Sequence, residues 1–314
     1  MSLAPFVRIV AQGKGRARSL TMPEAHEAMT IMLSGDAAPE AIGALLMVLR
    51  LRGETDAEIA GFTAALRGSM TVKPPKADLD WPCYAAGRTR GAPLFLLSAK
   101  LVANAGYRVA MHGWNSHQVG NANLRDAITD MDILSGGLSY APLEDLSPTA
   151  FDLLQLRDTF GLRSCINTVL RMWNPTGADA SVQGVFHPSY RGLQSRAAAL
   201  LGDQALTVIK GGGGEFERNP TKDVAVFGLR SGVDLNLTAT AIESGARKLH
   251  APDQPVDLSE LWSGRTDNAF AKATVTGTAA LALWTLGAAT TIPKAEAMAN
   301  ALWQDRHQNQ RKTA

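Results

Sequence analysis

Apolar positions recur with helical spacing in the first 72 residues of the chain. One run occupies positions i, i+3, i+4 and i+7, which form one face of a helix: Ile42, Leu45, Leu46 and Leu49. The segments that begin at Thr21 and Thr55 have the Thr-x-x-Glu pattern of a capping box, which predicts a helix start. We therefore predict a small all-helical domain over residues 1–72. Its apolar faces exceed what it can bury alone, so we expect it to pack against a later segment or a second subunit.

From residue 73 onward, short apolar runs alternate with helical patterns. The predicted strands are Tyr107–His112, Ala205–Lys210, Asp223–Gly228 and Val233–Thr238. The predicted helices are Leu94–Ala105, Asn123–Thr129, Thr149–Phe160, Gly192–Leu201, Ala271–Leu286 and Pro293–Gln308. Such alternation is typical of an α/β domain with a mostly parallel sheet and helices on both faces. We predict this larger domain over residues 73–314, beginning with an extended connector that runs to Trp81.

A further helix is predicted over residues 162–174. It carries Arg163 and Arg171 two turns apart, and the sequence Asn174-Pro175 ends it. The helix lies between α/β elements in the sequence. We nevertheless expect it to join the N-terminal helices, which would make the helical domain discontinuous.

The composition is that of an ordinary globular protein, with 46% hydrophobic and 19% charged residues. No apolar run reaches the length that is needed to cross a bilayer, so we expect no membrane segment. The chain has two cysteines, Cys83 and Cys165, which are far apart and lack metal-ligand spacing. We therefore predict a cytoplasmic protein with reduced thiols.

Positive charge is unevenly distributed, although the formal net charge is only +2. Residues 73–118 carry six Lys and Arg against two Asp and Glu. At the N-terminus, Lys14, Arg16 and Arg18 precede Glu24, which is the first acidic residue. Such segregation can build a basic face on a nearly neutral protein.

The segment from Ala85 to Trp114 has the pattern of a phosphate-binding βα unit. A loop with Gly87 and Gly91 precedes a helix, and backbone N–H groups at a helix N-terminus favour anions. The same loop carries Arg88 and Arg90, which we predict to contact phosphate; two solvated loop arginines are the simpler alternative.

Other cations are assigned to the same predicted basic surface: Lys14, Arg16, Arg18, Arg163, Arg171 and Lys210. Exposed or ion-paired side chains are the alternative for each. The run Gly211–Gly214 after Lys210 either cradles phosphate or forms a tight turn. Glu215 and Glu217 are more easily explained as carboxylates on a solvated loop than as a metal pair. The sequence contains no CxxC or HExxH pattern and no evident Ser-His-Asp set.

Residues 31–67, IMLSGDAAPEAIGALLMVLRLRGETDAEIAGFTAALR, closely resemble the helical domain of anthranilate phosphoribosyltransferase and its relatives in glycosyltransferase family 3. The segments LRSCINTVLRMWNP at 162–175 and GTAALALW at 277–284 extend the resemblance over nearly the whole chain. It implies a nucleoside phosphorylase/phosphoribosyltransferase-like fold, with a substrate cleft between the two domains. It also implies a homodimer formed through the N-terminal helices.

The chain departs from the family pattern where the chemistry lies. The family's Gly-Thr-Gly-Gly-Asp loop for phosphoribosyl pyrophosphate corresponds to AGRTRG at 86–91, which has lost the acid. Its Lys-His-Gly-Asn motif is MHGW at 111–114, and its magnesium-binding Asp-Glu pair is Gly-Glu at 214–215. The matching residues are assigned to a degraded ancestral site: Gly87, Gly91, His112, Gly113 and Glu215. By the same resemblance, Arg163 corresponds to the arginine that meets the aromatic acid substrate.

These departures resemble a divergent branch of the family whose members bind DNA and RNA through a basic groove. The segments YAAGR at 84–88 and HPSY at 187–190 look like that branch. Our first hypothesis is a non-catalytic, cofactor-free homodimer that binds nucleic acid largely without sequence preference. Single strands would be preferred if Trp114 stacks bases. The alternative is a phosphoribosyl- or glycosyltransferase that uses phosphoribosyl pyrophosphate with magnesium and an unidentified acceptor. A sensor of a nucleotide-like molecule remains open as well.

Overall fold

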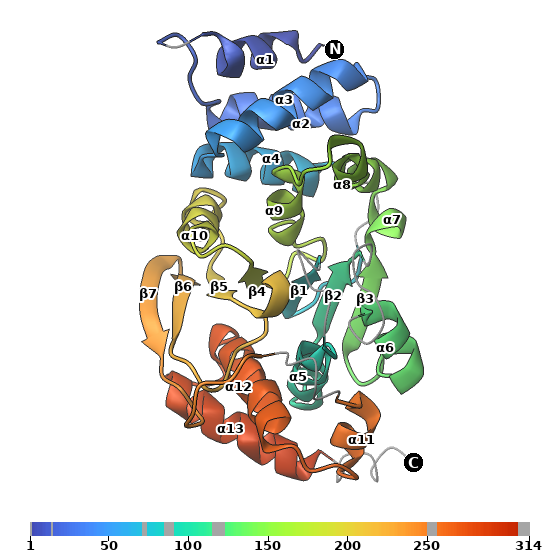
Figure 1. Cartoon of the computed structure of the whole chain (residues 1–314), viewed down its shortest axis with the longest axis vertical. Coiled ribbons are helices and arrows are strands. Elements are labelled where there is room, and N and C mark those ends of the chain that lie inside the picture. Colours follow the sequence, from blue (N-terminus) through green and yellow to red (C-terminus); the bar gives the residue numbers. More distant parts are fainter. Residues whose placement is uncertain are drawn as a thin grey trace.

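The computed structural model of the protein describes residues 2–13, 15–70, 74–84, 91–114, 123–249 and 256–306. Figure 1 shows an elongated molecule with N-terminal helices at one end, a β-sheet across the middle, and C-terminal helices beyond the sheet. Among the described helices, none is both long and apolar enough to span a bilayer.

The N-terminal end consists of α1 (Ala4–Ala11), α2 (Met22–Leu33), α3 (Pro39–Arg52) and α4 (Asp56–Gly68). Both predicted capping boxes are present. The side chains of Thr21 and Thr55 accept the backbone N–H groups of Glu24 and Glu58, and each glutamate accepts the backbone N–H group of its threonine in return. The predicted starts of α2 and α4 are therefore confirmed.

In the described part of the chain, seven strands form one sheet with the order β3-β2-β1-β4-β5-β6-β7. The strands are β1 (Leu79–Cys83), β2 (Val109–Gly113), β3 (Leu138–Pro142), β4 (Ala180–Val185), β5 (Ala205–Lys210), β6 (Val224–Arg230) and β7 (Val233–Ala239). The first five strands pair in parallel, whereas β6 and β7 are antiparallel. The predicted α/β class with a mostly parallel sheet is confirmed.

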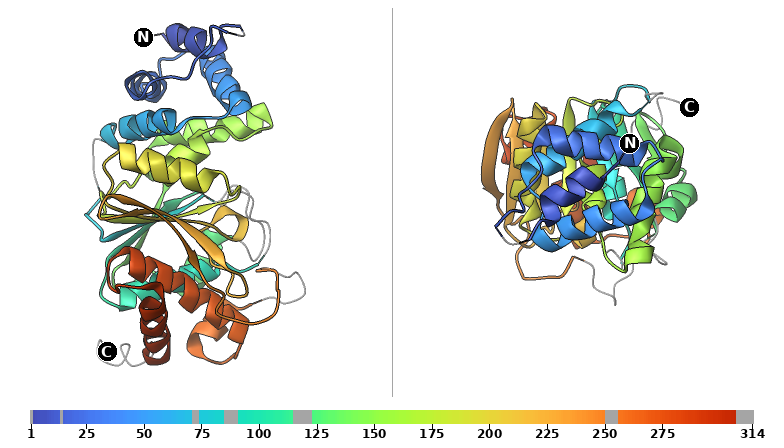
Figure 2. Two further views of the ribbon diagram at one scale, coloured as in Figure 1. Left: turned by 90° about the vertical axis from the view of Figure 1, so that its left-hand side faces the viewer. Right: turned by 90° about the horizontal axis from the view of Figure 1, so that it is seen from above.

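Helices cover both faces of this sheet (Figure 2). One face packs against α5 (Leu94–Asn104), α12 (Ala269–Thr285) and α13 (Ile292–Asp305), with α11 (Leu258–Ser263) at their side. On the other face, α9 (Ile166–Arg171) and α10 (Tyr190–Leu200) lie between the sheet and the N-terminal helices. The remaining helices follow β2 and β3: α6 (Leu124–Met131), α7 (Leu143–Leu146) and α8 (Pro148–Phe160).

The buried apolar side chains form two main clusters in the described residues, one on each side of the sheet. The cluster on the side of the N-terminal helices joins α2, α3 and α4 to α9 and to the sheet. Its members include Phe62, Val169, Trp173 and Val208. The apolar faces of the N-terminal helices are thus covered by later segments of the same chain, as burial of such faces requires. The predicted domain boundary at residue 72 stays a prediction.

Two local predictions are wrong. The predicted connector ends in a strand, β1, which is buried at all five positions. The helix predicted over 162–174 is shorter, because Gly161 in the left-handed conformation ends α8 and residues 162–165 lead into α9 without helical structure. Arg163 therefore lies on a loop, while Arg171 ends α9.

Candidate functional site

A pocket lies between the N-terminal helices and the carboxyl end of β4. Its volume is about 290 Å³, and its walls come from α3, the α8–α9 segment, the end of β4 and α10. The carboxyl ends of parallel strands are where open α/β sheets bind ligands. Four of its described lining residues are arginines: Arg50, Arg157, Arg163 and Arg171. We call this cavity the arginine pocket.

In the part of the chain that the structure describes, the four pocket arginines lack carboxylate partners. Within the described residues, no carboxylate lines the pocket and none forms an ion pair with any of the four. Other arginines of the chain are paired: Arg18 with Glu24, Arg52 with Glu58, Arg67 with Asp203, Arg108 with Asp78, Arg125 with Glu144, Arg196 with Asp56 and Arg218 with Glu296. The pocket therefore concentrates guanidinium groups whose charge the fold itself does not pair.

Arg171 is the most buried of the four, with 6% of its surface exposed. Its Nη1 donates to the backbone oxygen of Asn167 at 3.0 Å, whereas its buried Nη2 has no hydrogen-bond partner in the described residues. Burial lowers the pKa of Arg171, and the nearby charge of Glu215 opposes that effect. Because an unsatisfied buried donor is costly, this side chain favours an anionic ligand that accepts its free N–H group.

Arg163 is affected by the positive charges of all three other pocket arginines. Burial, and after it the positive charges of Arg157, Arg171 and Arg50, together lower its pKa to about 10. Burial also lowers the pKa of Arg157, and one of its buried guanidinium nitrogens has no hydrogen-bond partner within the described part of the chain. An anion next to Arg163 would relieve the repulsion among these groups.

The pocket also has an aromatic side. Phe186 is 44% exposed and its ring meets that of His187 edge-on, with centroids 4.9 Å apart. The Tyr190 hydroxyl donates to Glu54 at 3.1 Å. Burial and the neighbouring Glu54 raise the pKa of Tyr190 to about 12. The cavity thus offers apolar surface beside the cations, which suits a ligand that has both an apolar body and a negative charge.

The residues assigned to a degraded ancestral site are mostly inside the protein. His112 is 1% exposed, its Nδ1 lies 2.8 Å from the Tyr84 hydroxyl, and its Nε2 lies 3.1 Å from Asp80 Oδ1. A Cβ at Gly113 would stand 1.8 Å from the backbone oxygen of Cys83, so only glycine fits there. These two residues serve strand packing in the structure, and His112 is not exposed to a ligand.

Glu215 and Glu217 are both buried, so the interpretation as solvated loop carboxylates is wrong. Glu217 accepts the backbone N–H group of Phe95 at 2.9 Å, at the start of α5. Any Cβ at Gly211 would stand 1.7 Å from the backbone oxygen of Glu215, which supports the tight-turn interpretation of the glycine run.

Magnesium needs well-placed oxygen ligands. The described residues contain no group of three or more His, Cys, Asp or Glu side chains that could hold a metal ion. The carboxylates of Glu215 and Glu217 are enclosed by the fold, and the charge of Glu215 acts on Arg171. These residues do not fit a magnesium site.

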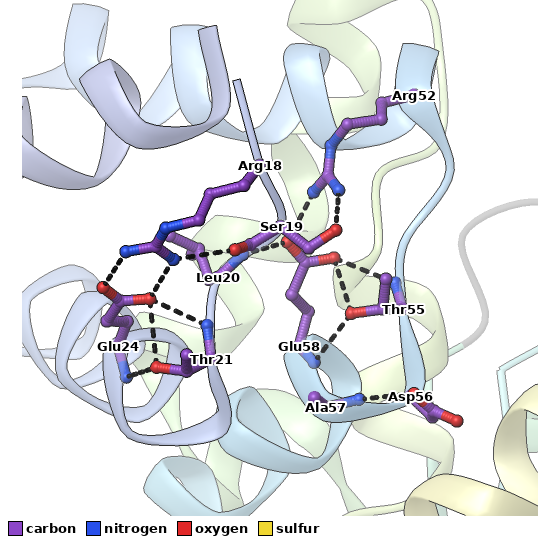
Figure 3. A network of polar contacts seen from close by, with 10 residues as sticks. All are labelled: Arg18, Ser19, Leu20, Thr21, Glu24, Arg52, Thr55, Asp56, Ala57 and Glu58. Carbon is purple, nitrogen blue, oxygen red and sulfur yellow. Dashed lines mark hydrogen bonds and ion pairs between the residues drawn. The ribbon is translucent and has the colours of Figure 1, made fainter. Parts of the chain in front are cut away.

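The other predicted cations do not gather at the arginine pocket. Arg18 forms a bidentate ion pair with Glu24 at 2.6 and 2.7 Å, at the N-terminal end of the molecule (Figure 3). Arg16 is exposed in the turn after α1. Lys210 lines a separate cavity of about 250 Å³ with Arg191 and Lys222. The structure thus brings Arg163 and Arg171 together and leaves the others apart.

Several predicted site residues lie outside the described residues: Lys14, Gly87, Arg88 and Arg90. Gly91 is described and has φ of +76°, a conformation that glycine adopts readily. Trp114 packs edge-on against Phe151, with centroids 5.2 Å apart, which supports a packing role over base stacking.

Sequence reasoning missed Arg50 and Arg157. Each lies in the last turn of an amphipathic helix, where a basic residue is ordinarily explained by the helix dipole. The available signal was their position: Arg50 falls within the segment 31–67 that carries the family resemblance, and Arg157 lies six residues before Arg163.

Comparison with known proteins identifies the family. The model of the glycosyl transferase family helical bundle domain matches residues 6–70. The anthranilate phosphoribosyltransferase of Mesorhizobium japonicum is 30% identical over 256 residues, which cover 75% of this chain and 74% of that protein. The chain belongs to the anthranilate phosphoribosyltransferase-like family. Another family member, the anthranilate phosphoribosyltransferase of Geobacillus kaustophilus, is 28% identical over 312 residues. The matched residues cover 92% of this chain and 90% of that protein.

Solved structures of the anthranilate phosphoribosyltransferase-like family have the same fold. The Thermus thermophilus anthranilate phosphoribosyltransferase superposes with a TM-score of 0.74 at 23% identity, over 91% of this chain and 92% of that chain. The Saccharomyces cerevisiae enzyme, solved with phosphoribosyl pyrophosphate and magnesium, superposes with a TM-score of 0.75 at 14% identity. The superposition covers 96% of this chain and 93% of that chain. The family resemblance seen in residues 31–67 is confirmed. The assignment to a nucleic-acid-binding branch stays a prediction.

Proposed function

We propose that this family member is a phosphoribosyltransferase-type protein that binds a small anionic acceptor in the arginine pocket. The observation that carries the proposal is the pocket itself, which four arginines line at the carboxyl end of β4, none of them paired with a carboxylate of the described residues. The related proteins are named for anthranilate, an aromatic acid with one carboxylate. An acceptor of that kind matches both the cations and the aromatic side of the pocket.

The pocket residues have distinct tasks in this proposal. Arg163 and Arg171 bind the anionic group through charge-assisted hydrogen bonds, which guanidinium forks make to carboxylates in pairs. Phe186 and Tyr190 pack against the apolar body and exclude water. Transfer forms a bond from a nucleophilic atom of the acceptor, which in anthranilate is the amino nitrogen, to the ribose carbon that carries pyrophosphate. Pyrophosphate leaves with the electron pair of the broken C–O bond, and the acceptor nitrogen releases one proton to solvent.

Acceptor-dependent release of pyrophosphate tests this function. The purified protein is incubated with phosphoribosyl pyrophosphate, magnesium and either anthranilate or another aromatic acid, and the products are separated by chromatography. We expect a phosphoribosylated product that is reduced at least tenfold in Arg163→Met, because a charged hydrogen-bond partner is worth about 1.5–3 kcal/mol. Arg265→Met removes an exposed arginine on the C-terminal side of α11 and serves as the control.

A thermal-shift measurement separates binding from transfer. An acceptor at about 100 times its Kd should stabilise the folded state by about 2.7 kcal/mol through ligand linkage. If no aromatic acid raises the melting temperature and none supports pyrophosphate release, the proposed function is wrong.

The second candidate function is nucleic-acid binding by a homodimer that associates through its N-terminal helices. What favours it is the same set of unpaired arginines beside the exposed ring of Phe186, on which a base could stack. The separate positions of Arg16 and Lys210 give it less support. Affinity for DNA or RNA should fall with salt at a slope of about −0.7 to −0.9 per phosphate neutralised. Binding that is insensitive to salt, or equal in Arg163→Met and wild type, would count against it.

A further inference from the structure

The pocket arginines lie at different depths. Arg171 is buried beneath the pocket, Arg157 and Arg163 are half-buried, and Arg50 is exposed at the end of α3. They belong to separate segments of the chain: α3, α8, the loop after α8, and α9. An anion held next to the buried Arg171 therefore lies at a different depth from the exposed Arg50.

One carboxylate also accepts too few hydrogen bonds to pair with all four pocket arginines. A guanidinium group has five N–H donors, whereas a carboxylate accepts about four hydrogen bonds. In the described residues, a backbone oxygen takes one donor of Arg171, and none of the four arginines is paired with a carboxylate. One carboxylate can thus satisfy two bidentate arginines and leaves the others without a partner.

Three carboxylates of the described residues act on side chains of the pocket. The charge of Glu215 acts on Arg171, that of Asp158 acts on its sequence neighbour Arg157, and Glu54 accepts a hydrogen bond from the hydroxyl of Tyr190. None of them acts on Arg163, whose charged neighbours in the described part of the chain are the other three pocket arginines. The centre of the pocket therefore keeps a positive potential after these carboxylates are counted.

We propose that the arginine pocket binds a compact ligand with an apolar body and at least two anionic groups, one held deep by Arg171 and Arg163 and one held at the mouth by Arg50 and Arg157. This inference rests on the proposed function, in that the ligand would be its acceptor. The exposed side chains of Leu162 and Phe186 provide the surface for the apolar body. A volume of about 290 Å³ lies at the lower end of small-molecule sites, which limits the ligand to a small molecule.

A series of benzene carboxylates tests the number and spacing of the anionic groups. Binding of benzoate, phthalate, isophthalate and terephthalate is measured by isothermal titration calorimetry at one ionic strength. We expect the best dicarboxylate to bind about tenfold more tightly than benzoate, or better, because it adds charge-assisted hydrogen bonds. A smaller ratio for all three isomers would overturn the inference.

Variants show whether the two anionic groups use the two pairs of arginines. Arg50→Met removes an exposed cation at the mouth, so the fold is expected to tolerate it. It should reduce the affinity of the best dicarboxylate to near that of benzoate and leave benzoate binding within about twofold. Arg171→Met should weaken both ligands, and Arg265→Met should weaken neither. Equal losses for both ligands in Arg50→Met would overturn the inference.

The outcomes separate this inference from the proposed function. If a monocarboxylate accepts the phosphoribosyl group and binds as tightly as every dicarboxylate, the function stands and the inference fails. If the dicarboxylate binds as expected but no phosphoribosyl transfer occurs, the inference stands and the transferase function fails. If a short oligonucleotide binds through the pocket arginines and no dicarboxylate displaces it, the small-molecule inference is wrong.

Discussion

Arg67 joins the last turn of α4 to two later segments of the chain. Its guanidinium donates to the backbone oxygens of Met172 at 2.8 Å and Trp173 at 3.0 Å, just after α9. It also forms a bidentate ion pair with Asp203, at 2.7 and 2.9 Å, in the turn before β5. One side chain thus holds the N-terminal helices, the end of α9 and the sheet in register, and its replacement should lower the free energy of unfolding.

The size of the loss follows from these contacts. Arg67→Met keeps most of the apolar stem but removes all four hydrogen bonds and leaves two carbonyl groups and a carboxylate without their partner. Hydrogen bonds to charged groups contribute about 1.5–3 kcal/mol each in favourable cases, but they are not additive, and the side chain is 25% exposed. We expect a total loss of about 3 kcal/mol.

A matched control is available in Arg196. Arg196 also pairs with a carboxylate, that of Asp56 at 2.8 Å, but its side chain is 61% exposed. Exposed ion pairs contribute about 0–1 kcal/mol, so Arg196→Met should cost little. Asp203→Asn should cost less than Arg67→Met, because Arg67 keeps its two carbonyl acceptors.

Urea unfolding followed by tryptophan fluorescence measures these differences, and Trp173 lies directly at the contact. Far-UV circular dichroism provides a second probe, since coincident transitions are needed for a free energy to be assigned. A loss below about 1 kcal/mol for Arg67→Met, or a loss equal to that of Arg196→Met, would refute the reasoning.

Three other perturbations should behave as follows. Within α4, Gly61→Ala places a Cβ 2.3 Å from a backbone oxygen of α2 and should cost about 2 kcal/mol or more in urea unfolding. Gly68→Ala meets no atom within 4 Å and should raise stability by about 0.5 kcal/mol; a loss as large as that of Gly61→Ala would contradict the packing argument. Hydrogen bonds from Arg18, and after them those from Thr21, lower the pKa of Glu24 from 4.5 to about 2. Its charge therefore stabilises the fold above pH 4.5, and this contribution is lost as the pH falls toward 2. The difference in thermal stability between the wild type and Glu24→Gln should therefore shrink over that pH range, and a constant difference would disprove the assignment. Burial raises the pKa of the Cys165 thiol, so mass spectrometry should find it labelled by a thiol reagent only after unfolding; labelling in the native protein would contradict its burial.

Local sequence signals predicted the parts of the fold that local interactions determine. The capping boxes at Thr21 and Thr55 satisfy backbone groups within one turn, so they mark α2 and α4 without tertiary information. Strand β1 escaped prediction because it contains Asp80 and Pro82, which are rare inside strands. Asp80 is tolerated there because Ser181 on β4 donates to it at 2.9 Å, a partner that lies a hundred residues away.

The candidate site depended on distant contacts in the same way. The spacing of Arg163 and Arg171 drew attention to one segment, and the family resemblance added a role for Arg163. Neither could indicate that Arg50 of α3 and Arg157 of α8 meet them across the cavity. Conversely, the cluster around Arg18 predicted a basic surface, whereas Arg18 is paired with Glu24 across the cap of α2.

The position of Arg50 on α3 has a dynamic consequence. The other pocket arginines lie on α8, on the loop that follows it and on α9, so a ligand that contacts both sides links α3 to these segments without any covalent bond. Local opening of α3 must then break ligand contacts first, and the free energy of that opening rises by the binding free energy that is lost. Amide protons in the last turn of α3 should exchange with solvent more slowly when the pocket is filled, although the ligand touches only one side chain of that helix.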